Sequence, residues 1–289
     1  MTTEPDFIAA LRTLATHPAA RGLNDDAAVL GDLVFTHDMI AEGVHFLPDD
    51  PPQDVAWKLL AVNLSDLAAK GADPVGVLMG YALTGDPDWD AAFVQGLGDA
   101  LAHFAVPLLG GDTIALPGKR VMGLTAIGRS ARAPSRAGAR DGDALWVTGT
   151  IGGAGRGLAG DPAFLSAYRR PMPLLAEGRV LAPVVHAMMD VSDGLLIDAM
   201  RMAEASDLGL AIDLDALPLP AGYPGGDRAA RLGAATAGDD YQLLFALPAG
   251  ETPPVAASRI GAFAPGEGLQ LHDAMGPVAL PERLGYLHG

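Results

Sequence analysis

The sequence contains no cysteine, and this absence excludes several classes of chemistry together. Disulfide bonds, thiolate catalysis, zinc held by cysteine and iron–sulfur clusters all require that residue. Basic residues are also scarce: 19 Lys and Arg stand against 35 Asp and Glu, so the formal net charge is 19 − 35 = −16. Nucleic acids bind basic faces, and anionic membranes attract basic segments. We therefore expect neither nucleic acid nor membrane as a partner.

Long hydrophobic runs and familiar nucleotide-binding motifs are missing as well. No apolar stretch reaches the length of a membrane span, and the N-terminus, MTTEPDF, lacks the basic and apolar regions of a signal peptide. We therefore expect a cytoplasmic protein. The Walker P-loop, the protein-kinase motif set, G-x-S-x-G and H-E-x-x-H do not occur. Any phosphate chemistry must use a different arrangement.

The residues that are present predict a mixed fold of two domains. The length of 289 residues suits one large domain or two of ordinary size, and 49% of the residues are hydrophobic. Predicted strands and helices alternate, which indicates an α/β to α+β class. Residues 129–143 are rich in Arg, Ala, Gly and Pro without apolar periodicity. We place the boundary there, giving domains at 1–140 and 141–289.

The predicted elements follow apolar periodicity and turn signals. Helices are expected at 5–15, 54–72, 89–104, 173–181, 195–205 and 228–232. Strands are expected at 27–30, 33–36, 75–83, 106–109, 121–127, 144–147, 184–189, 210–214 and 241–247. The tail from 259 to 289 is expected to form short strands and loops.

The helix expected at residues 54–72 is unusual because polar residues lie within an almost wholly apolar segment. A helix that is apolar all round is normally buried. Asn63 and Asp66 are three residues apart and share one face of it, and Ser65 lies between them. A buried carboxylate is costly unless a cation meets it. Either a basic side chain or a metal ion must therefore lie beside Asp66, and we favour the metal.

Aspartates also cluster with glycine at the predicted ends of strands and starts of helices. The clusters are Asp25-Asp26, Asp38, Asp66, Gly110-Gly111-Asp112, Asp190 with Asp193, and Asp239-Asp240. Carboxylates bind Mg²⁺, and glycine lets the backbone approach a ligand closely. The pattern predicts a phosphate-rich ligand held through Mg²⁺. The alternative is that Asp and Gly only form turns and N-caps here, as Ser192 or Asp193 would for the following helix.

Seven motifs in chain order carry a family resemblance. They are residues 24–28 (NDDAA), 36–38 (THD), 43–46 (GVHF), 61–72 (AVNLSDLAAKGA), 109–113 (LGGDT), 190–195 (DVSDGL) and 238–241 (GDDY). Together they resemble the thiamine-monophosphate kinase family, in the superfamily of aminoimidazole ribonucleotide synthetase. The resemblance implies a two-domain fold whose N-terminal halves pair into a dimeric β-barrel. It also implies transfer of the ATP γ-phosphoryl group to thiamine monophosphate, giving thiamine diphosphate and ADP.

The resemblance assigns roles to individual residues. Metal positions fall on Asp26, Thr36, His37, Asp38, Asp66, Asp112, Asp190 and Asp193. ATP positions fall on Gly111, Asp112, Arg136 and Ser192, and substrate positions fall on His45, Asp239 and Tyr286. The chemistry is consistent with these roles, because a phosphate acceptor is already anionic and needs no general base. Several Mg²⁺ ions would offset the repulsion between two polyanions and align them. Arg136 is either a partner of ATP phosphates or a solvated linker charge.

The sequence departs from the family pattern at four positions. Asn24 replaces a Gly, His37 replaces a Thr, Asp239 replaces a Glu, and Leu174 replaces an Arg. Asn tolerates the left-handed region, so the first change preserves the turn. The change at His37 is harmless if a backbone carbonyl binds the metal and alters one site if the side chain does. Asp239 reaches one methylene less far than Glu.

Two alternatives remain open on the sequence. The first is another ATP-dependent enzyme of the superfamily, such as aminoimidazole ribonucleotide synthetase. The second is a non-catalytic Mg–nucleotide binding protein, which would bind ATP without making ADP. Selenophosphate synthetase and the carbamoyl-dehydrating hydrogenase maturation protein share the superfamily, but both rely on a cysteine that is absent here.

Overall fold

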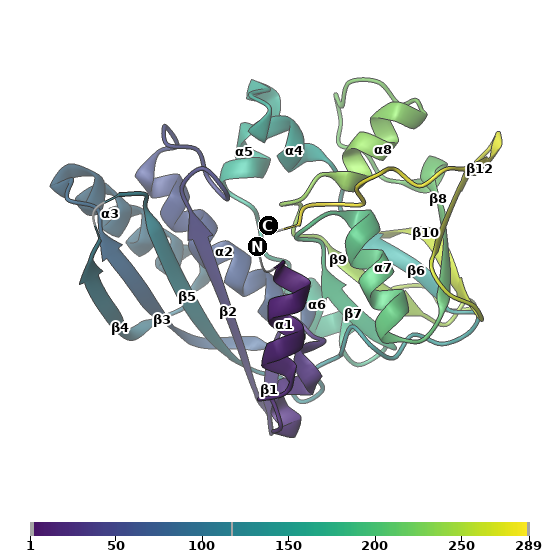
Figure 1. The fold of residues 1–289 in the computed structure, drawn as a ribbon, viewed down its shortest axis with the longest axis horizontal. Helices are drawn as coiled ribbons and strands as arrows, with labels where there is room; N and C mark the ends of the chain where they lie inside the picture. The colour runs from purple at the N-terminus through teal and green to yellow at the C-terminus, as the bar shows by residue number, and fades with distance from the viewer. Residues whose placement is uncertain (1–2, 117, 288–289) are drawn as a thin grey trace.

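Two mixed β-sheets are packed on either side of one buried helix, as the computed structural model shows for residues 3–116 and 118–287 (Figure 1). Helix α2 (Pro52–Ala69) contacts the first sheet through β2 and β5 and the second half of the chain through β7 and α6. Every residue from Val55 to Ala69 is buried. Because a helix apolar all round needs cover on all sides, both halves of the chain contribute to burying it.

The first sheet is formed by the N-terminal half of the chain. Its order is β1 (Ala28–Leu30), β2 (Leu33–Ala41), β5 (Val121–Arg129), β3 (Asp73–Leu83) and β4 (Leu108–Ala115). The pairs are antiparallel except β3 with β4, which are parallel. A parallel pair needs a crossover, and helix α3 (Pro87–Phe104) provides it. Helices α2 and α3 pack together.

The second sheet is formed by the C-terminal half. Its order is β12 (Gly276–Val278), β11 (Leu269–Asp273), β8 (Gly209–Asp213), β10 (Ala257–Ala264), β6 (Ala144–Thr148), β9 (Leu243–Leu247) and β7 (Ala187–Asp190). The remaining helices are α1 (Glu4–Arg12), α4 (Gly153–Leu158), α5 (Leu165–Arg169), α6 (Leu175–Leu181), α7 (Leu195–Ala205) and α8 (Arg228–Thr236), with short 3₁₀ turns at Pro18–Leu23, Pro162–Phe164 and Leu214–Ala216. Residues 130–143, between the sheets, contain no helix or strand.

Strand β4 differs from the sequence expectation. The sequence predicts a strand at 106–109 followed by a glycine turn, but the strand runs through Gly110, Gly111 and Asp112 to Ala115. A Cβ atom on Gly111 would lie 1.9 Å from the carbonyl oxygen of Met79 on the neighbouring strand. The glycine therefore permits close strand pairing rather than a turn. Every residue of β4 is exposed.

Strand β2 also extends beyond its predicted end at Thr36, reaching Ala41. Successive side chains of a strand point to opposite faces. Thr36 and Asp38 therefore share one face, and His37 lies on the other. Across the described residues, 3–116 and 118–287, the helices are too short or too polar to cross a membrane.

Candidate active site

A cavity of about 540 Å³ gathers most of the predicted site residues. Its wall is built from β2, α2, the loop before α7, the loop before β9 and the C-terminal tail. Nine predicted residues line it: Asp26, Asp38, His45, Asp66, Arg136, Ser192, Asp193, Asp239 and Tyr286. The cavity thus combines acidic, basic and substrate positions that lie far apart in the sequence.

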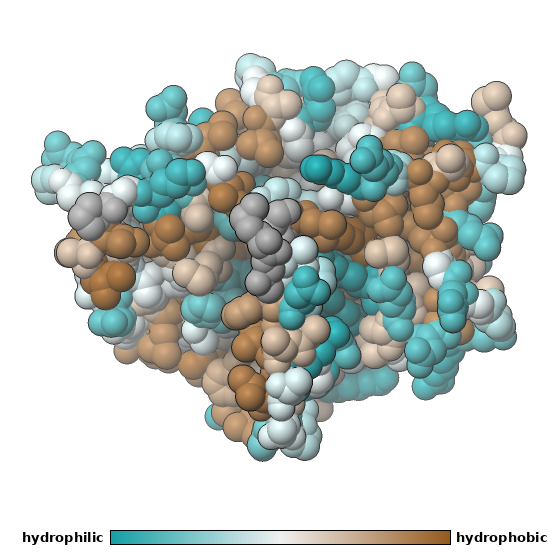
Figure 2. Space-filling model, in the orientation of Figure 1, coloured by the Kyte–Doolittle hydropathy of each residue, from teal (hydrophilic) through white to brown (hydrophobic). Residues whose placement is uncertain are grey.

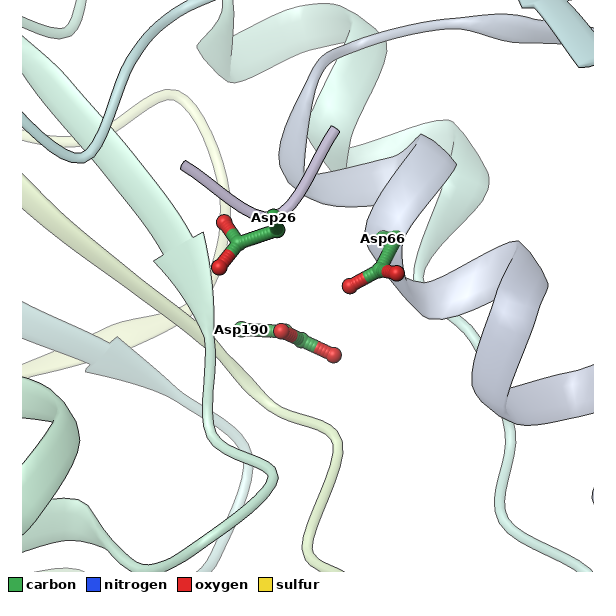
Figure 3. A group of neighbouring side chains, drawn as sticks. All are labelled: Asp26, Asp66 and Asp190. Atoms are coloured by element: carbon green, nitrogen blue, oxygen red, sulfur yellow. The ribbon is translucent and has the colours of Figure 1, made fainter. Parts of the chain in front are cut away.

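Three aspartates converge at the wall of the cavity, where Asp26 and Asp66 line it and Asp190 lies beside them (Figure 3). Asp26 comes from the loop before β1, Asp66 from the last turn of α2, and Asp190 from the end of β7. One carboxylate oxygen from each lies within 4.8 Å of the other two. Oxygen ligands in such a group suit a hard divalent cation such as Mg²⁺.

Asp66 and Asp190 have hydroxyl partners instead of cationic ones. The Thr36 hydroxyl donates to Asp66, and Ser65 Oγ donates to Asp190 Oδ2 at 2.5 Å. Within the described residues, neither carboxylate forms an ion pair with Lys or Arg. Of the two partners expected for Asp66, a basic side chain or a metal ion, the described residues do not provide the basic side chain.

The pKa values of these carboxyls reflect burial and the charges of neighbouring carboxylates. Burial, followed by the charges of Asp38, Asp190 and Asp26, raises the pKa of Asp66 well above its usual range. Burial and the charge of Asp26 raise the pKa of Asp190 to about 8. Burial, with the charges of Asp26 and Asp193, raises the pKa of Asp38 to about 6. A bound divalent cation reverses this preference, because it stabilises the ionised form of each ligand.

Asp26 has the opposite environment. Lys70 Nζ donates to Asp25 Oδ1 at 2.5 Å and to Asp26 Oδ2 at 2.7 Å, while Arg136 donates to Asp26 Oδ1. Burial alone would raise the pKa of Asp26, but Lys70 and Arg136 hold it well below its usual range. Arg136 is thus part of the site and not a solvated linker charge. Lys70 was not predicted, although it lies four residues after Asp66 in the sequence, as the C-cap of α2.

The loop before α7 is fixed by a buried carboxylate that the sequence analysis missed. Asp198 Oδ2 accepts hydrogen bonds from the backbone N–H groups of Ser192, Asp193 and Gly194 at 3.0, 3.1 and 3.2 Å. Arg201 pairs with both Asp193 and Asp198. Gly194 is the N-cap of α7, without a side-chain cap bond, so Ser192 and Asp193 are not capping residues. Both residues line the cavity, Asp193 as the partner of Arg201.

Two of the predicted substrate residues, His45 and Asp239, are connected through Lys58, whereas the backbone N–H of the third, Tyr286, donates to the Asp193 carbonyl at 2.9 Å. Lys58 Nζ donates to Asp239 Oδ2 at 2.7 Å and to the His45 carbonyl at 2.9 Å, and it lies 4.1 Å from the ring centre of Tyr168. The Tyr241 hydroxyl donates to the other Asp239 oxygen at 2.9 Å. These bonds connect α2 to the second half of the chain. Lys58 was not predicted, because nothing in the sequence relates it to a residue 181 positions away.

Five predicted residues are not among those that line the cavity. Two of them, Thr36 and Asp190, lie next to the lining residue Asp66, and the other three lie farther away. The His37 ring, on the other face of β2, is hydrogen-bonded to the Thr125 hydroxyl at 2.9 Å. Gly111 and Asp112 are on β4, at the edge of the first sheet away from β2 (Figure 1). A role for His37 as a metal ligand would therefore use its backbone carbonyl, and Asp112 does not meet the other aspartates within one chain.

Comparisons with known proteins agree with the fold and the motifs. Residues 24–130 match the family described as AIR synthase related protein, N-terminal domain, and residues 140–251 match its C-terminal domain. A thiamine-monophosphate kinase of Caulobacter vibrioides is 38% identical over 99% of this chain and 91% of its own length. One from Escherichia coli is 37% identical over 78% of this chain and 76% of its own length.

A solved structure, AaThiL complexed with AMPPCP and TMP, superposes with a TM-score of 0.88 at 28% identity. The superposition covers 99% of this chain and 97% of the other. The chain therefore has the two-domain arrangement of this structure, with one domain in each half. The chain belongs to the thiamine-monophosphate kinase family of phosphotransferases, within the AIR synthase related proteins.

Proposed function

We propose that this protein transfers the γ-phosphoryl group of ATP to thiamine monophosphate, giving thiamine diphosphate and ADP. The observation that carries the proposal is the group of buried aspartates in a cavity, of which Asp66 and Asp190 lack a cationic partner among the described residues. The likeness to AaThiL, which was solved with AMPPCP and TMP, supports both substrates. Membership of the kinase family supports the reaction.

The residues present fit a magnesium-dependent site. We propose that Asp38, Asp66 and Asp190 are the principal Mg²⁺ ligands, with Asp26, Thr36 and Asp193 bordering the same space. Bound Mg²⁺ would neutralise phosphate charge that carboxylates alone would repel. The hydroxyls of Thr36 and Ser65 orient Asp66 and Asp190, so that the chain preorganises the ligands.

The remaining residues position the two substrates. We propose that Arg136 and Ser192 contact ATP phosphates, and that His45, Asp239 and Tyr286 contact thiamine monophosphate. In the proposed in-line step, an anionic oxygen of thiamine monophosphate forms a bond to the γ-phosphorus as the bond between that phosphorus and the β–γ bridging oxygen breaks. The released ADP carries away the bridging oxygen. No side chain has to act as a general base, because the acceptor is already ionised.

We further propose that the active form is a homodimer whose first sheets pair into a β-barrel. Strand β4 is an exposed edge strand, and its apolar residues Leu108, Leu109 and Ile114 are about half exposed. Figure 2 shows hydrophobic residues over the left side of the molecule, where β3 and β4 lie in Figure 1. An exposed apolar edge normally pairs with another chain. Such pairing would carry Gly111 and Asp112 toward a second copy.

Two other features belong to the same proposal. We divide the chain into an ATP- and Mg²⁺-binding, dimer-forming domain at 1–140 and an α+β domain at 141–289. The first sheet ends at Arg129 and the second begins at Ala144, which supports that division. We place the reaction in the cytoplasm, where ATP is supplied.

The test is to incubate the purified protein with ATP, Mg²⁺ and thiamine monophosphate and to separate the products by chromatography. Thiamine diphosphate that forms only with Mg²⁺ supports the proposal. ATP binding without ADP formation would instead support a non-catalytic nucleotide-binding protein. ADP formation with a different phosphate acceptor would support another enzyme of the superfamily.

A further inference from the structure

The acidic cavity is divided into two parts by the charges of its neighbours. In one part, Asp66 and Asp190 receive only hydroxyl hydrogen bonds. In the other, the adjacent pair Asp25 and Asp26 is surrounded by basic side chains. A uniform cluster of metal ligands would not show this contrast, so the two parts need separate explanations.

Lys70 is at the centre of the neutralised part. Its side chain and that of Asp25 are fully buried, and that of Asp26 is 7% exposed. Its ammonium group donates to both carboxylates and to the Met188 carbonyl at 3.3 Å. A buried ammonium keeps its charge only where such acceptors surround it.

The carboxylate oxygens of this pair are all engaged. Lys70 and Arg136 each donate to one oxygen of Asp26, and Lys70 and Arg21 each donate to one oxygen of Asp25. Two negative charges therefore face three positive ones. A metal ion at Asp26 would have to share each carboxylate oxygen with a charge-assisted hydrogen bond, and it would lie close to three cations.

We propose that Lys70 is a built-in cation that takes the place of a divalent ion between Asp25 and Asp26. The metal requirement of the site is then confined to Asp38, Asp66 and Asp190, and Asp26 is a structural partner of Lys70 instead of a metal ligand. This inference takes from the proposed function only that the site binds Mg²⁺. Lys70 is a positioning residue, because it acts through the two aspartates.

The fixed cation has a consequence for the enzyme without bound metal. A pair of carboxylates that depended on Mg²⁺ would repel each other whenever the ion left. Lys70 belongs to the chain and cannot dissociate, so the loop carrying Asp25 and Asp26 keeps its place beside the cavity without metal. Its position just after α2, four residues after Asp66, fixes the two parts of the site relative to each other.

The experiment counts Mn²⁺, a spectroscopic substitute for Mg²⁺, bound to the full-length protein in the presence of AMPPCP. The signal of free Mn²⁺ in electron paramagnetic resonance gives the number bound. Lys70→Met should bind about one more Mn²⁺ per chain than the unaltered protein, because loss of the ammonium frees one oxygen of each carboxylate for a divalent ion. Lys70→Arg keeps the cation and should bind the unaltered number.

Lys58→Met is the matched control, because Lys58 is a second buried lysine of the same segment that contacts neither Asp25 nor Asp26. It should leave the Mn²⁺ count unchanged. An unchanged or smaller count in Lys70→Met would overturn the proposal, as would an equal gain in the Lys58 variant. The thermal midpoint of each variant, measured with and without Mn²⁺, establishes that the compared proteins are folded.

A second variant keeps the proposal testable should Lys70→Met fail to fold. Asp26→Asn should retain the Mn²⁺ count of the unaltered protein, whereas Asp66→Asn should lose bound Mn²⁺. Loss of an ion in Asp26→Asn would contradict the proposal. None of these Mn²⁺ counts depends on turnover. An absence of thiamine diphosphate in the activity assay would therefore refute the proposed function, while the Mn²⁺ counts would still decide the role of Lys70.

Discussion

Asp66 is buried in the last turn of α2, and among the described residues its carboxylate forms no ion pair with a cationic side chain. We expect Asp66→Asn to reduce turnover by more than about 100-fold, the scale on which removal of a charge-stabilising group acts. The free energy of unfolding without metal should stay the same or rise, because Asn still accepts the Thr36 hydrogen bond and carries no charge. Steady-state kinetics and urea denaturation measure the two effects.

Asp99→Asn is the control for this change, because Asp99 is an exposed acid on α3. It should alter neither quantity. Turnover of Asp66→Asn close to that of the unaltered protein would rule out the metal role of Asp66.

Stability without metal should depend on pH through Asp190 and Asp38. Their folded pKa values of about 8 and about 6 lie above the ordinary value of 3.8. The folded protein therefore binds more protons than the unfolded chain above about pH 4, and the free energy of unfolding falls as pH rises toward 8. We expect a fall of more than about 1 kcal/mol, since each unit of pKa difference is worth about 1.4 kcal/mol.

Urea denaturation at pH 5 and pH 8, with a chelator and then with Mg²⁺, checks this expectation. Mg²⁺ should raise the free energy of unfolding most at pH 8, because at that pH the carboxyls are most ionised and repel one another when no cation is bound. Equal stability at both pH values with the chelator present would show that these carboxyls do not titrate as described.

The sequence identified acidic residues better than it identified their partners. Nine predicted residues line one cavity, because a motif preserves the type of residue that a ligand requires. Lys58 and Lys70 were missed, since each lies in an apolar segment and its carboxylate partners are distant in the sequence. The partner of Lys58 is 181 positions away, and those of Lys70 are 45 and 44 positions away. Periodicity along one segment contains no information on such distant pairs.

At the scale of elements, α6 packs on α2 at a point where no side chain fits. A Cβ atom on Gly178 would lie 2.0 Å from the Ala68 carbonyl oxygen. We expect Gly178→Ala to lower the free energy of unfolding by about 1–3 kcal/mol, because the two helices must move apart. Urea denaturation measures the change.

Gly98→Ala is the matched control, because Gly98 is also within a helix and a Cβ atom added there would have no other atom within 4 Å. It should be neutral or stabilising by about 0.5–1 kcal/mol. A Gly178→Ala protein as stable as the Gly98 variant would show that the contact between α2 and α6 is looser than described.

The boundaries of elements were predictable where periodicity was strong. Helix α2 is expected at 54–72 and occurs at Pro52–Ala69, and α7 is expected at 195–205 and occurs at Leu195–Ala205. Strand β4 was not predicted correctly, because Gly110 and Gly111 are typical of turns in the sequence. Only the approach of Met79 in space explains why a strand needs glycine there.

At the scale of the whole molecule, the exposed strand β4 predicts self-association. Sedimentation should give twice the chain mass of 29.6 kDa at micromolar concentration. Ile114→Asp should give the mass of one chain, because Ile114 is 55% exposed on β4 and a carboxylate there would oppose pairing of two apolar edges. Its thermal midpoint should change little, because the side chain is not part of the core.

Met275→Glu is the control for that substitution, because Met275 is 89% exposed on the turn between β11 and β12, in the other sheet. It should sediment as the unaltered protein does. A monomeric unaltered protein would contradict the dimer and the barrel together.

The burial of α2 by both halves of the chain also bears on how the protein is made. Synthesis of the helix is complete at Ala69. The elements α6 and β7, which cover part of it, are complete only at Leu181 and Asp190, about 110 to 120 residues later. At about 5–20 residues per second, that interval is on the order of 10 s. For that time the nascent chain presents an apolar helix that has no cover on one side, so this segment is where we expect a chaperone to bind first.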